Sequence, residues 1–220
     1  MDEINQAKQN AAYLAVDENI QSGQKIGIGS GSTVVFAVQR IAKKYKTGAL
    51  KNIVCVPSSF QTRQLILKYQ LPLAEINQEP ILDIDIDGAD EIDASLNLIK
   101  GGGGCHLQEK IVAATAKSFI IIADFRKDSQ VLGEKWKKGV PLEVSPLAYQ
   151  PIIKKIQAMG GSPILRPAKS KAGPCVSDNG NFIIDADFGE ISNPAQLNLA
   201  LLQIPGVLET GLFINMAKHA

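Results

Sequence analysis

Residues 25–33 read KIGIGSGST, an apolar run that passes directly into glycines and hydroxyl side chains. The apolar part predicts a strand, and the pattern over 33–45 predicts a helix. Glycines between a strand and a helix allow a tight turn and let a ligand approach the backbone closely. A strand, turn and helix of this kind form the building block of an α/β fold.

The same alternation continues through the first half of the chain. Further strands are predicted over 52–56, 81–87 and 119–124, and further helices over 3–20, 58–69 and 106–117. Strands that alternate with helices of this length indicate βαβ units and an open parallel sheet. In the helix over 106–117, the spacing of Leu107, Ile111 and Ala114 predicts that these residues face the sheet.

The pattern changes after residue 132, where charges, glycines and prolines interrupt it. Strands are predicted over 140–144, 162–167 and 181–187, and helices over 145–159 and 193–202. This order indicates a smaller α+β subdomain over 133–203, a candidate contact surface between subunits. Residues 1–132 and 204–220 would form the α/β catalytic domain, with GVLETGLFI (206–214) as a strand that returns to it.

Composition narrows the classes of partner. The 220 residues carry a formal net charge of +1, without the excess of Lys and Arg that nucleic acids or anionic membranes require. The N-terminus does not resemble a signal peptide, and three cysteines without C-x-x-C spacing indicate neither a disulfide framework nor a zinc site. We expect a cytoplasmic protein with a small-molecule partner.

The turn between the first strand and its helix predicts a phosphate site. Glycines, helix N–H groups and the hydroxyls of Ser30, Ser32 and Thr33 are suited to an anion. The dinucleotide fingerprint requires glycine at 32 or 34, where the chain has Ser32 and Val34, and no lysine follows as in a P-loop. The alternative is that a hydroxyl here only caps the helix.

The stretch ILDIDIDGADEID (81–93) is rich in acids. Strict alternation over 81–87 predicts a solvated face for Asp83 and Asp85, whereas Asp87 falls at the carboxyl end of the strand. Asp90 follows one turn later, and Glu91 is expected in a solvated loop. A divalent cation is an alternative ligand, although the spacing is not that of an EF-hand.

Lys100 precedes four glycines, and Glu109 follows in the first turn of a predicted helix. Ordered glycines cost backbone entropy, so we expect their N–H groups to serve an oxyanion. The alternatives are a flexible linker for the glycines and a helix-dipole role for Glu109. Together, a carboxylate base, a lysine and an N–H-rich loop suit proton abstraction beside the carbonyl of a sugar phosphate.

The motifs GIGSGST, DGADEID, KGGGG and QEK occur in an order and spacing that resembles type A ribose-5-phosphate isomerase. FIIIADFRK, PLEV, SDNGN and PGVLETGLF extend the resemblance over nearly the whole chain. The resemblance implies a Rossmann-like open parallel sheet with a second, smaller α+β subdomain. It also implies a homodimer or homotetramer that interconverts ribose 5-phosphate and ribulose 5-phosphate in the pentose phosphate pathway, with no cofactor and no metal.

The resemblance also implies the site residues. Substrate contacts fall on Ser30, Gly31, Ser32, Thr33, Asp87, Gly88, Ala89, Asp90, Lys100, Gly101, Gly102, Gly103 and Lys127. Glu109 would be the base that forms an enediolate, Lys100 would stabilise its charge, and Asp87 would assist ring opening. Lys8 is a further candidate for phosphate binding, but its register is displaced from that of relatives.

Two rival functions differ in the residues that they need. An amino-sugar phosphate deaminase or a phosphogluconolactonase would use a well-placed histidine, for which His106, beside the glycine run, is the candidate. A non-catalytic sugar-phosphate sensor would retain the GSGST turn. It would have no need for Lys100 and Glu109 together.

Overall fold

The computed structural model describes residues 3–220 and divides them into two compact units. The first comprises the chain up to Ala89, Gln108–Arg126 and Met216–Ala220, and the second comprises Asp90–Leu107 and Lys127–Asn215. Over the described residues, no helix is long and apolar enough to span a bilayer.

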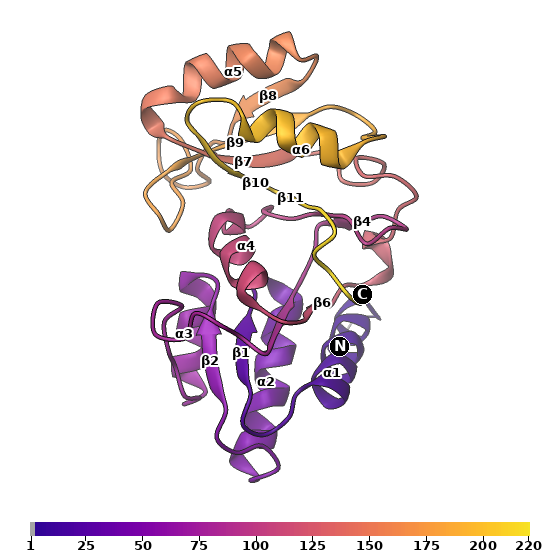
Figure 1. Ribbon diagram of the computed structural model, residues 1–220, viewed down its shortest axis with the longest axis vertical. Helices are drawn as coiled ribbons and strands as arrows, with labels where there is room; N and C mark the ends of the chain where they lie inside the picture. The colour runs from indigo at the N-terminus through magenta and orange to yellow at the C-terminus, as the bar shows by residue number, and fades with distance from the viewer. Residues whose placement is uncertain (1–2) are drawn as a thin grey trace. The chain divides into compact units, whose positions relative to one another are not determined.

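The first unit is built around a four-stranded parallel sheet in the order β2-β1-β3-β6. Its elements are α1 (Glu3–Asn19), β1 (Lys25–Ile28), α2 (Ser32–Lys46), β2 (Val54–Pro57), α3 (Phe60–Lys68), β3 (Ile84–Asp87), most of α4 (His106–Thr115) and β6 (Phe119–Ile121). The arrows of β1 and β2 point the same way in Figure 1. The predicted α/β architecture is confirmed.

The two faces of this sheet are covered by different helices. Ile26 and Ile28 of β1 belong to a buried cluster that includes residues of α1 and α2. Between them, Gly27 faces the opposite side, where a Cβ would lie 2.6 Å from Cγ1 of Val112 in α4. The alternation of a strand therefore sends one set of side chains to α1 and α2 and brings the other side against α4.

The expectation that Asp85 lies on a solvated face is wrong. All four residues of β3 are buried, and Asp85 is fully so, because its side chain lies beside Gly27 on the face of the sheet that carries Val112 of α4. Asp83 lies before the strand and is only partly buried, with an ion pair to Lys117 (2.7 Å).

The predicted inner face of α4 is also wrong. Ile111 is 46 % exposed, whereas Val112 and Ala113 are buried. Glu109 is buried on the same side, one turn before Val112. A pattern of apolar residues alone misses this face because a carboxylate occupies one of its positions.

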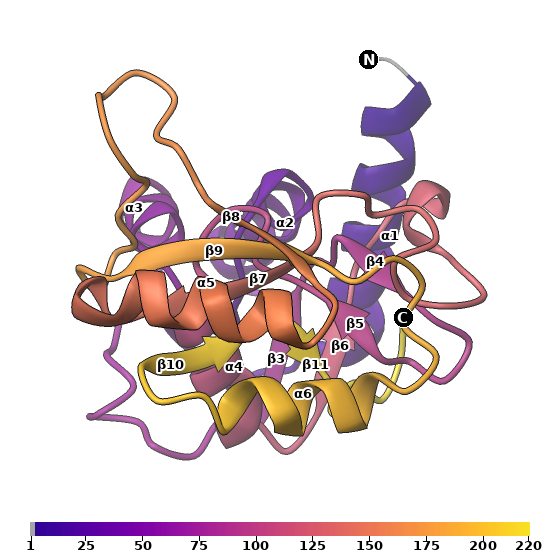
Figure 2. The same cartoon turned by 90° about the horizontal axis from the view of Figure 1, so that it is seen from above.

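The second unit is an α+β structure with two antiparallel sheets. It contains β4 (Glu91–Ile92), β5 (Leu98–Ile99), β7 (Val140–Val144), α5 (Tyr149–Ala158), β8 (Ser162–Leu165), β9 (Phe182–Asp187), α6 (Pro194–Leu202), β10 (Val207–Thr210) and β11 (Leu212–Phe213). The larger sheet has the order β10-β7-β9-β8 and the smaller one β11-β5-β4. Helix α5 packs on β8 and β9, and α6 packs on β10 (Figure 2).

The opposite faces of β7 have different roles. Val140, Leu142 and Val144 lie in the core of the second unit, together with residues of α5 and α6. Glu143 points the other way and is fully buried. Its Oε1 accepts hydrogen bonds from the side chains of three residues in SDNGN: Ser177 (2.6 Å), Asn179 (2.9 Å) and Asn181 (2.9 Å). This motif therefore anchors its loop to β7.

The second unit is larger than the subdomain expected over 133–203. Residues 90–107, 127–132 and 204–215 also belong to it. The stretch GVLETGLFI does not return to the parallel sheet, because β10 pairs with β7 and β11 pairs with β5. Strand pairing, which the sequence pattern does not specify, sets this boundary.

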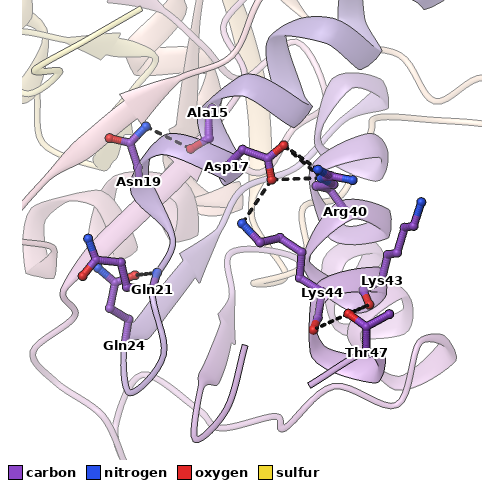
Figure 3. A network of polar contacts seen from close by, with 9 residues as sticks. All are labelled: Ala15, Asp17, Asn19, Gln21, Gln24, Arg40, Lys43, Lys44 and Thr47. Atoms are coloured by element: carbon purple, nitrogen blue, oxygen red, sulfur yellow. Dashed lines mark hydrogen bonds and ion pairs between the residues drawn. The ribbon is translucent and has the colours of Figure 1, made fainter. Parts of the chain in front are cut away.

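A network of charges links α1 to α2 in the first unit. Arg40 donates to both carboxylate oxygens of Asp17 through Nε and Nη2, and Lys44 donates to Oδ1 (3.1 Å) (Figure 3). The hydrogen bond from Arg40 is the main cause that lowers the pKa of Asp17 below its usual value. The pair is a two-point arginine fork on the surface of two packed helices.

Candidate active site

The turn after β1 is closed by the carboxylate of Asp87, at the end of β3. Oδ1 of Asp87 accepts the backbone N–H groups of Ser30 (2.9 Å) and Gly88 (2.6 Å). A Cβ on Gly29 would lie 1.9 Å from this carboxylate, so the site accepts only glycine there. The GSGST turn and Asp87 therefore lie together, since the neighbouring parallel strands β1 and β3 end at one edge of the sheet.

The hydroxyls of this turn do not cap α2. The N-cap residue is Gly31, with a φ of 105° and no side-chain capping bond, so the capping alternative is wrong. Ser32 begins the helix, and its Oγ accepts a hydrogen bond from Nζ of Lys8 (3.0 Å). Lys8 thus brings a positive charge to a helix N-terminus, the combination that binds anions. Thr33 follows in the same turn and is partly buried.

Residues beyond those predicted complete the turn. Oγ of Ser30 is hydrogen-bonded to Oγ of Ser59 (2.7 Å) and lies 3.1 Å from Oγ of Ser58. Gly31 donates its N–H to the side chain of Gln61 (2.9 Å). These three residues follow β2 in VPSSFQ, and the rule that ligands bind beyond the carboxyl ends of parallel strands could have found them.

Glu109 lies in the first turn of α4 and is 5 % exposed. The carbonyl of Thr115, at the last turn of α4, accepts the N–H of Leu82, which precedes β3 (3.0 Å). Val112, in the middle of the helix, lies against Gly27 of β1. Helix α4 therefore runs antiparallel to the strands, and Glu109 lies at the same carboxyl edge of the sheet as Asp87.

The second unit gathers the other predicted segments around the glycine run. Lys100 follows β5, is 3 % exposed and holds its Nζ over the ring of Phe213, 5.4 Å from its centre. The N–H of Lys100 is donated to the carbonyl of Gly211 (2.8 Å). Asp90 accepts the N–H of Gly102 at Oδ2 (2.6 Å). These bonds fix the run, so the flexible-linker alternative is wrong.

Three of the four glycines are required by the fold, for different reasons. Gly101 (φ 96°) and Gly104 (φ 81°) have left-handed backbones, and the N–H of Gly104 is donated to the carbonyl of Gly101 (2.9 Å). A Cβ on Gly102 would lie 2.7 Å from the ring of Trp136. A Cβ on Gly103 would meet nothing within 4 Å.

Lys127 contacts the ring of Trp136, which in turn packs against the glycine run. Its Nζ lies 5.6 Å from the centre of the Trp136 ring, and Lys138 lies 5.1 Å from it. The far edge of the same ring packs on Gly102. A cation over an aromatic face is attracted by the ring quadrupole, whose face is negative. Trp136 was not predicted, and its contact with the glycine run could not be inferred from its place in the sequence.

Glu91 is not the solvated acid that was expected. It is fully buried, and Oε1 accepts hydrogen bonds from Ser129 (2.8 Å) and from the backbone of Lys135 (2.6 Å) and Trp136 (3.2 Å). Oε2 accepts the N–H of Gly133 (2.6 Å). This carboxylate therefore holds the segment that carries Trp136.

His106, the residue on which the rival functions depended, begins α4 and is fully buried. A Cβ on Gly101 would lie 2.6 Å from its Nδ1, so the imidazole packs directly against the glycine run. Among residues 3–220, no group of three or more His, Cys, Asp or Glu side chains is placed to hold a metal ion.

The predicted residues thus fall into two groups. The first unit holds Ser30, Gly31, Ser32, Thr33, Asp87, Gly88, Ala89 and Glu109, and the second holds Asp90, Lys100, Gly101, Gly102, Gly103 and Lys127. The first group offers helix N–H groups, hydroxyls and a lysine for an anion, with a buried carboxylate at the same edge. The second offers a lysine and a glycine backbone held in place.

The chain is similar to known proteins over most of its length. Residues 54–220 match the family model for ribose 5-phosphate isomerase A (phosphoriboisomerase A). The chain is 55 % identical to ribose-5-phosphate isomerase of Homo sapiens, covering 100 % of this chain and 70 % of that protein. It is 56 % identical to the Dictyostelium discoideum enzyme, covering 99 % and 93 %.

Solved structures show the same fold. A D-ribose-5-phosphate isomerase in complex with phospho-erythronic acid superposes with a TM-score of 0.94 at 39 % identity, covering 99 % of this chain and 93 % of that one. Ribose 5-phosphate isomerase A of Methanocaldococcus jannaschii gives 0.91 at 37 % identity, covering 97 % and 93 %. The chain belongs to the ribose 5-phosphate isomerase A family.

Proposed function

We propose that Glu109 is the general base of an aldose–ketose isomerisation that proceeds through a cis-enediolate. Family membership supplies the reaction, the interconversion of ribose 5-phosphate and ribulose 5-phosphate in the pentose phosphate pathway. The observation that carries the proposal is the burial of Glu109 at the edge of the sheet that also holds Asp87. A buried carboxylate is costly, and such groups concentrate at functional sites.

In the forward direction, Glu109 takes the proton from C2 of the open-chain aldose. The electron pair of the broken C–H bond forms the C1–C2 double bond, and the carbonyl pair moves to O1, which gives the enediolate. A proton then passes from O2 to O1, the C2 carbonyl forms, and Glu109 returns its proton to C1. One base therefore serves both carbons, and no electrons leave the substrate.

The phosphate of the substrate is assigned to the first turn of α2. The N–H groups of this turn, the hydroxyls of Ser32 and Thr33 and the ammonium of Lys8 support this assignment. Lys8 was a candidate for phosphate binding whose register is displaced from that of relatives. Its bond to Ser32 supports adding it.

The charge on the enediolate is assigned to Lys100 and the N–H groups of the glycine run. Gly102 donates its N–H to Asp90 in this structure, which leaves Gly101 and Gly103 as the backbone donors in our proposal. A well-aimed donor of this kind contributes about 3 kcal/mol to the transition state. Asp87 would assist ring opening, and Asp90 and Lys127 would contact the sugar.

Phospho-erythronic acid, which a solved relative binds, suits this arrangement. Its carboxylate imitates the paired oxygens of the enediolate, while its phosphate imitates that of the substrate. We therefore expect this chain to bind it. By resemblance to the family, we also propose a cytoplasmic homodimer or homotetramer that needs neither metal nor cofactor.

The test is the variant Glu109→Gln, which retains the shape of the side chain and removes the base. We expect kcat for ribose 5-phosphate to fall about 10²- to 10⁴-fold with the protein still folded. Glu18→Gln, at an exposed position of α1, is the matched control and should leave kcat unchanged. A Glu109→Gln enzyme with parental kcat would refute the assignment of the base.

The enediolate has its own test in D₂O. A proton held by Glu109 can exchange with solvent before it returns, so ribulose 5-phosphate formed by the parent enzyme should carry deuterium at C1. A hydride passed directly from C2 to C1 would carry none. Deuterium at C1 would therefore exclude direct hydride transfer, whereas its absence would not separate that route from an enediolate whose proton Glu109 returns before exchange.

A further inference from the structure

Arg166 binds the glycine run on its carbonyl side. It follows β8, and its Nη1 donates to the carbonyl oxygens of Gly101 (3.1 Å) and Gly102 (3.2 Å). Its Nε and Nη2 donate to Asp185 of β9, at 2.8 Å and 2.5 Å. A single planar guanidinium thus connects a strand of the larger sheet with two successive peptide groups of the loop.

The contact between Arg166 and the carbonyl of Gly102 fixes the direction of the Gly103 N–H, because both groups belong to one planar peptide. In a trans peptide, the carbonyl and the N–H of the next residue point in opposite directions. The carbonyl of Gly102 points at Arg166, so the N–H of Gly103 points away from it. Within residues 3–220 this N–H makes no hydrogen bond, and a Cβ on Gly103 would meet open space. The donor therefore points to the side of the loop opposite Arg166 and is used by none of the described residues.

The preceding peptide is held at both ends. Its carbonyl oxygen, on Gly101, accepts from Arg166, and its N–H, on Gly102, is donated to Asp90. Rotation of either peptide would break these bonds. The left-handed Gly101 would otherwise allow such rotation, since glycine lacks the steric barrier of a Cβ.

Arginine is the residue that this geometry requires. The side chains of Arg166 and Asp185 are each 16 % exposed, so the pair is shielded from water. Burial is the largest single effect and works against the charge of Arg166, but the hydrogen bond to Asp185 and the nearby negative charges, Asp185 foremost, together raise its pKa above the usual value. A lysine ammonium could carry the charge but could not reach the carboxylate and both carbonyls in one plane.

We propose that Arg166, anchored by Asp185, is a positioning residue that aims the Gly103 N–H at the oxyanion of the reacting sugar. The inference rests on the proposed role of the glycine run in stabilising the enediolate. Arg166 touches only protein in this account, and it acts through the loop. Its loss should therefore raise the barrier of the chemical step while leaving phosphate binding intact.

The experiment compares Arg166→Lys, Arg166→Gln and Asp185→Asn with the parent. We expect each to lower kcat about 10²-fold, the cost of a misplaced catalytic group, with KM for ribose 5-phosphate changed less than about threefold. Affinity for phospho-erythronic acid should fall with kcat, whereas affinity for inorganic phosphate should not. The double variant Arg166→Gln/Asp185→Asn should lose no more than Arg166→Gln alone, because Asp185 acts through Arg166.

The matched control is Arg40, which forms the same two-point fork with Asp17 on the helices of the first unit. Arg40→Lys and Arg40→Gln should retain parental kcat, even where the melting temperature falls. If Arg166→Gln does not fold, Arg166→Lys and Asp185→Asn carry the test, because both nearly preserve the packed volume.

The results distinguish failure of the positioning role of Arg166 from failure of the proposed role of Glu109. Retention of kcat by folded Arg166→Lys and Asp185→Asn, while Glu109→Gln is inactive, would overturn the positioning role alone. Equal loss of affinity for phosphate and for phospho-erythronic acid would also overturn it, because it would indicate a general structural defect. An active Glu109→Gln would instead refute the proposed base and leave the Arg166 comparison standing.

Discussion

At the scale of single residues, Gly102 and Gly103 separate what the fold requires from what a substrate would require. A methyl group on Gly102 would come within 2.7 Å of Trp136 and 2.8 Å of the Asp90 carboxylate. At Gly103 it would contact nothing, and the backbone is not in the left-handed region. The fold therefore gives no reason for glycine at position 103, and we propose that the substrate does.

We predict opposite effects of alanine at these two positions. Gly102→Ala should lower the free energy of unfolding by about 1–3 kcal/mol, because Trp136 or Asp90 must move. Gly103→Ala should preserve stability or raise it by about 0.4–1 kcal/mol, yet lower kcat/KM for ribose 5-phosphate. Urea unfolding and steady-state kinetics measure both quantities. A fully active Gly103→Ala would mean that the substrate does not approach this residue.

Individual site residues could be predicted where a strand end placed them. Ser30 follows β1 and Asp87 ends β3, and from the parallel order of these strands their proximity, though not their hydrogen bond, could be anticipated. The burial of Glu91 could not, because the donors that satisfy it come from residues 129–136, distant in the sequence. A charged side chain is predicted to be exposed unless its hydrogen-bond partners are known.

At the scale of elements, long periodic segments were predictable and short ones were not. Helix α2 and strand β7 were predicted nearly to the residue. Strands β4 and β5 have two residues each, too few to show a period, and they form through pairing with each other and with β11. The face of α4 was mispredicted because Glu109 occupies one of its buried positions.

The carboxylate at the start of β4 gives an element-scale prediction. Glu91→Gln replaces one acceptor oxygen by an NH₂ group, which would face an N–H or O–H donor from the segment over 129–136. We expect the free energy of unfolding to fall by about 1–3 kcal/mol, the cost of an unsatisfied buried polar group. Urea unfolding followed by Trp136 fluorescence measures it.

Glu190→Gln, at an exposed position, should change the free energy of unfolding by no more than about 0.5 kcal/mol. Equal stability of Glu91→Gln and the parent would show that the four hydrogen bonds do not hold the segment. In that event, the position of Trp136 would have to depend on its other contacts, including the hydrogen bond from its ring nitrogen to Gly139 (2.8 Å).

At the scale of the whole molecule, the chain crosses between the two units more often than the sequence pattern predicts. It passes between them after residues 89, 107, 126 and 215. The second crossing falls inside α4, whose first two residues belong to the second unit and whose remainder belongs to the first. The end of the regular strand–helix alternation near residue 132 predicts the α+β part. The positions of the crossings depend on which strands pair, and the sequence pattern does not specify this.

This connectivity predicts a single unfolding transition, although each unit has its own core. Leu142→Ala removes a fully buried side chain from the second unit and should cost about 2–5 kcal/mol. If the units unfold together, the first unit must lose the same stability; four chain crossings, one of them within α4, are the reason to expect this coupling.

Two side chains report on the units separately. Trp136, the sole tryptophan, lies in the second unit, and Cys55 lies in the core of the first. Burial raises the pKa of the Cys55 thiol to about 12, so its labelling requires unfolding. In a Cys105→Ser/Cys175→Ser background, Leu142→Ala should shift the urea midpoints of Trp136 fluorescence and Cys55 labelling equally. Movement of the fluorescence midpoint alone would show that the units unfold independently and that α4 divides at the crossing.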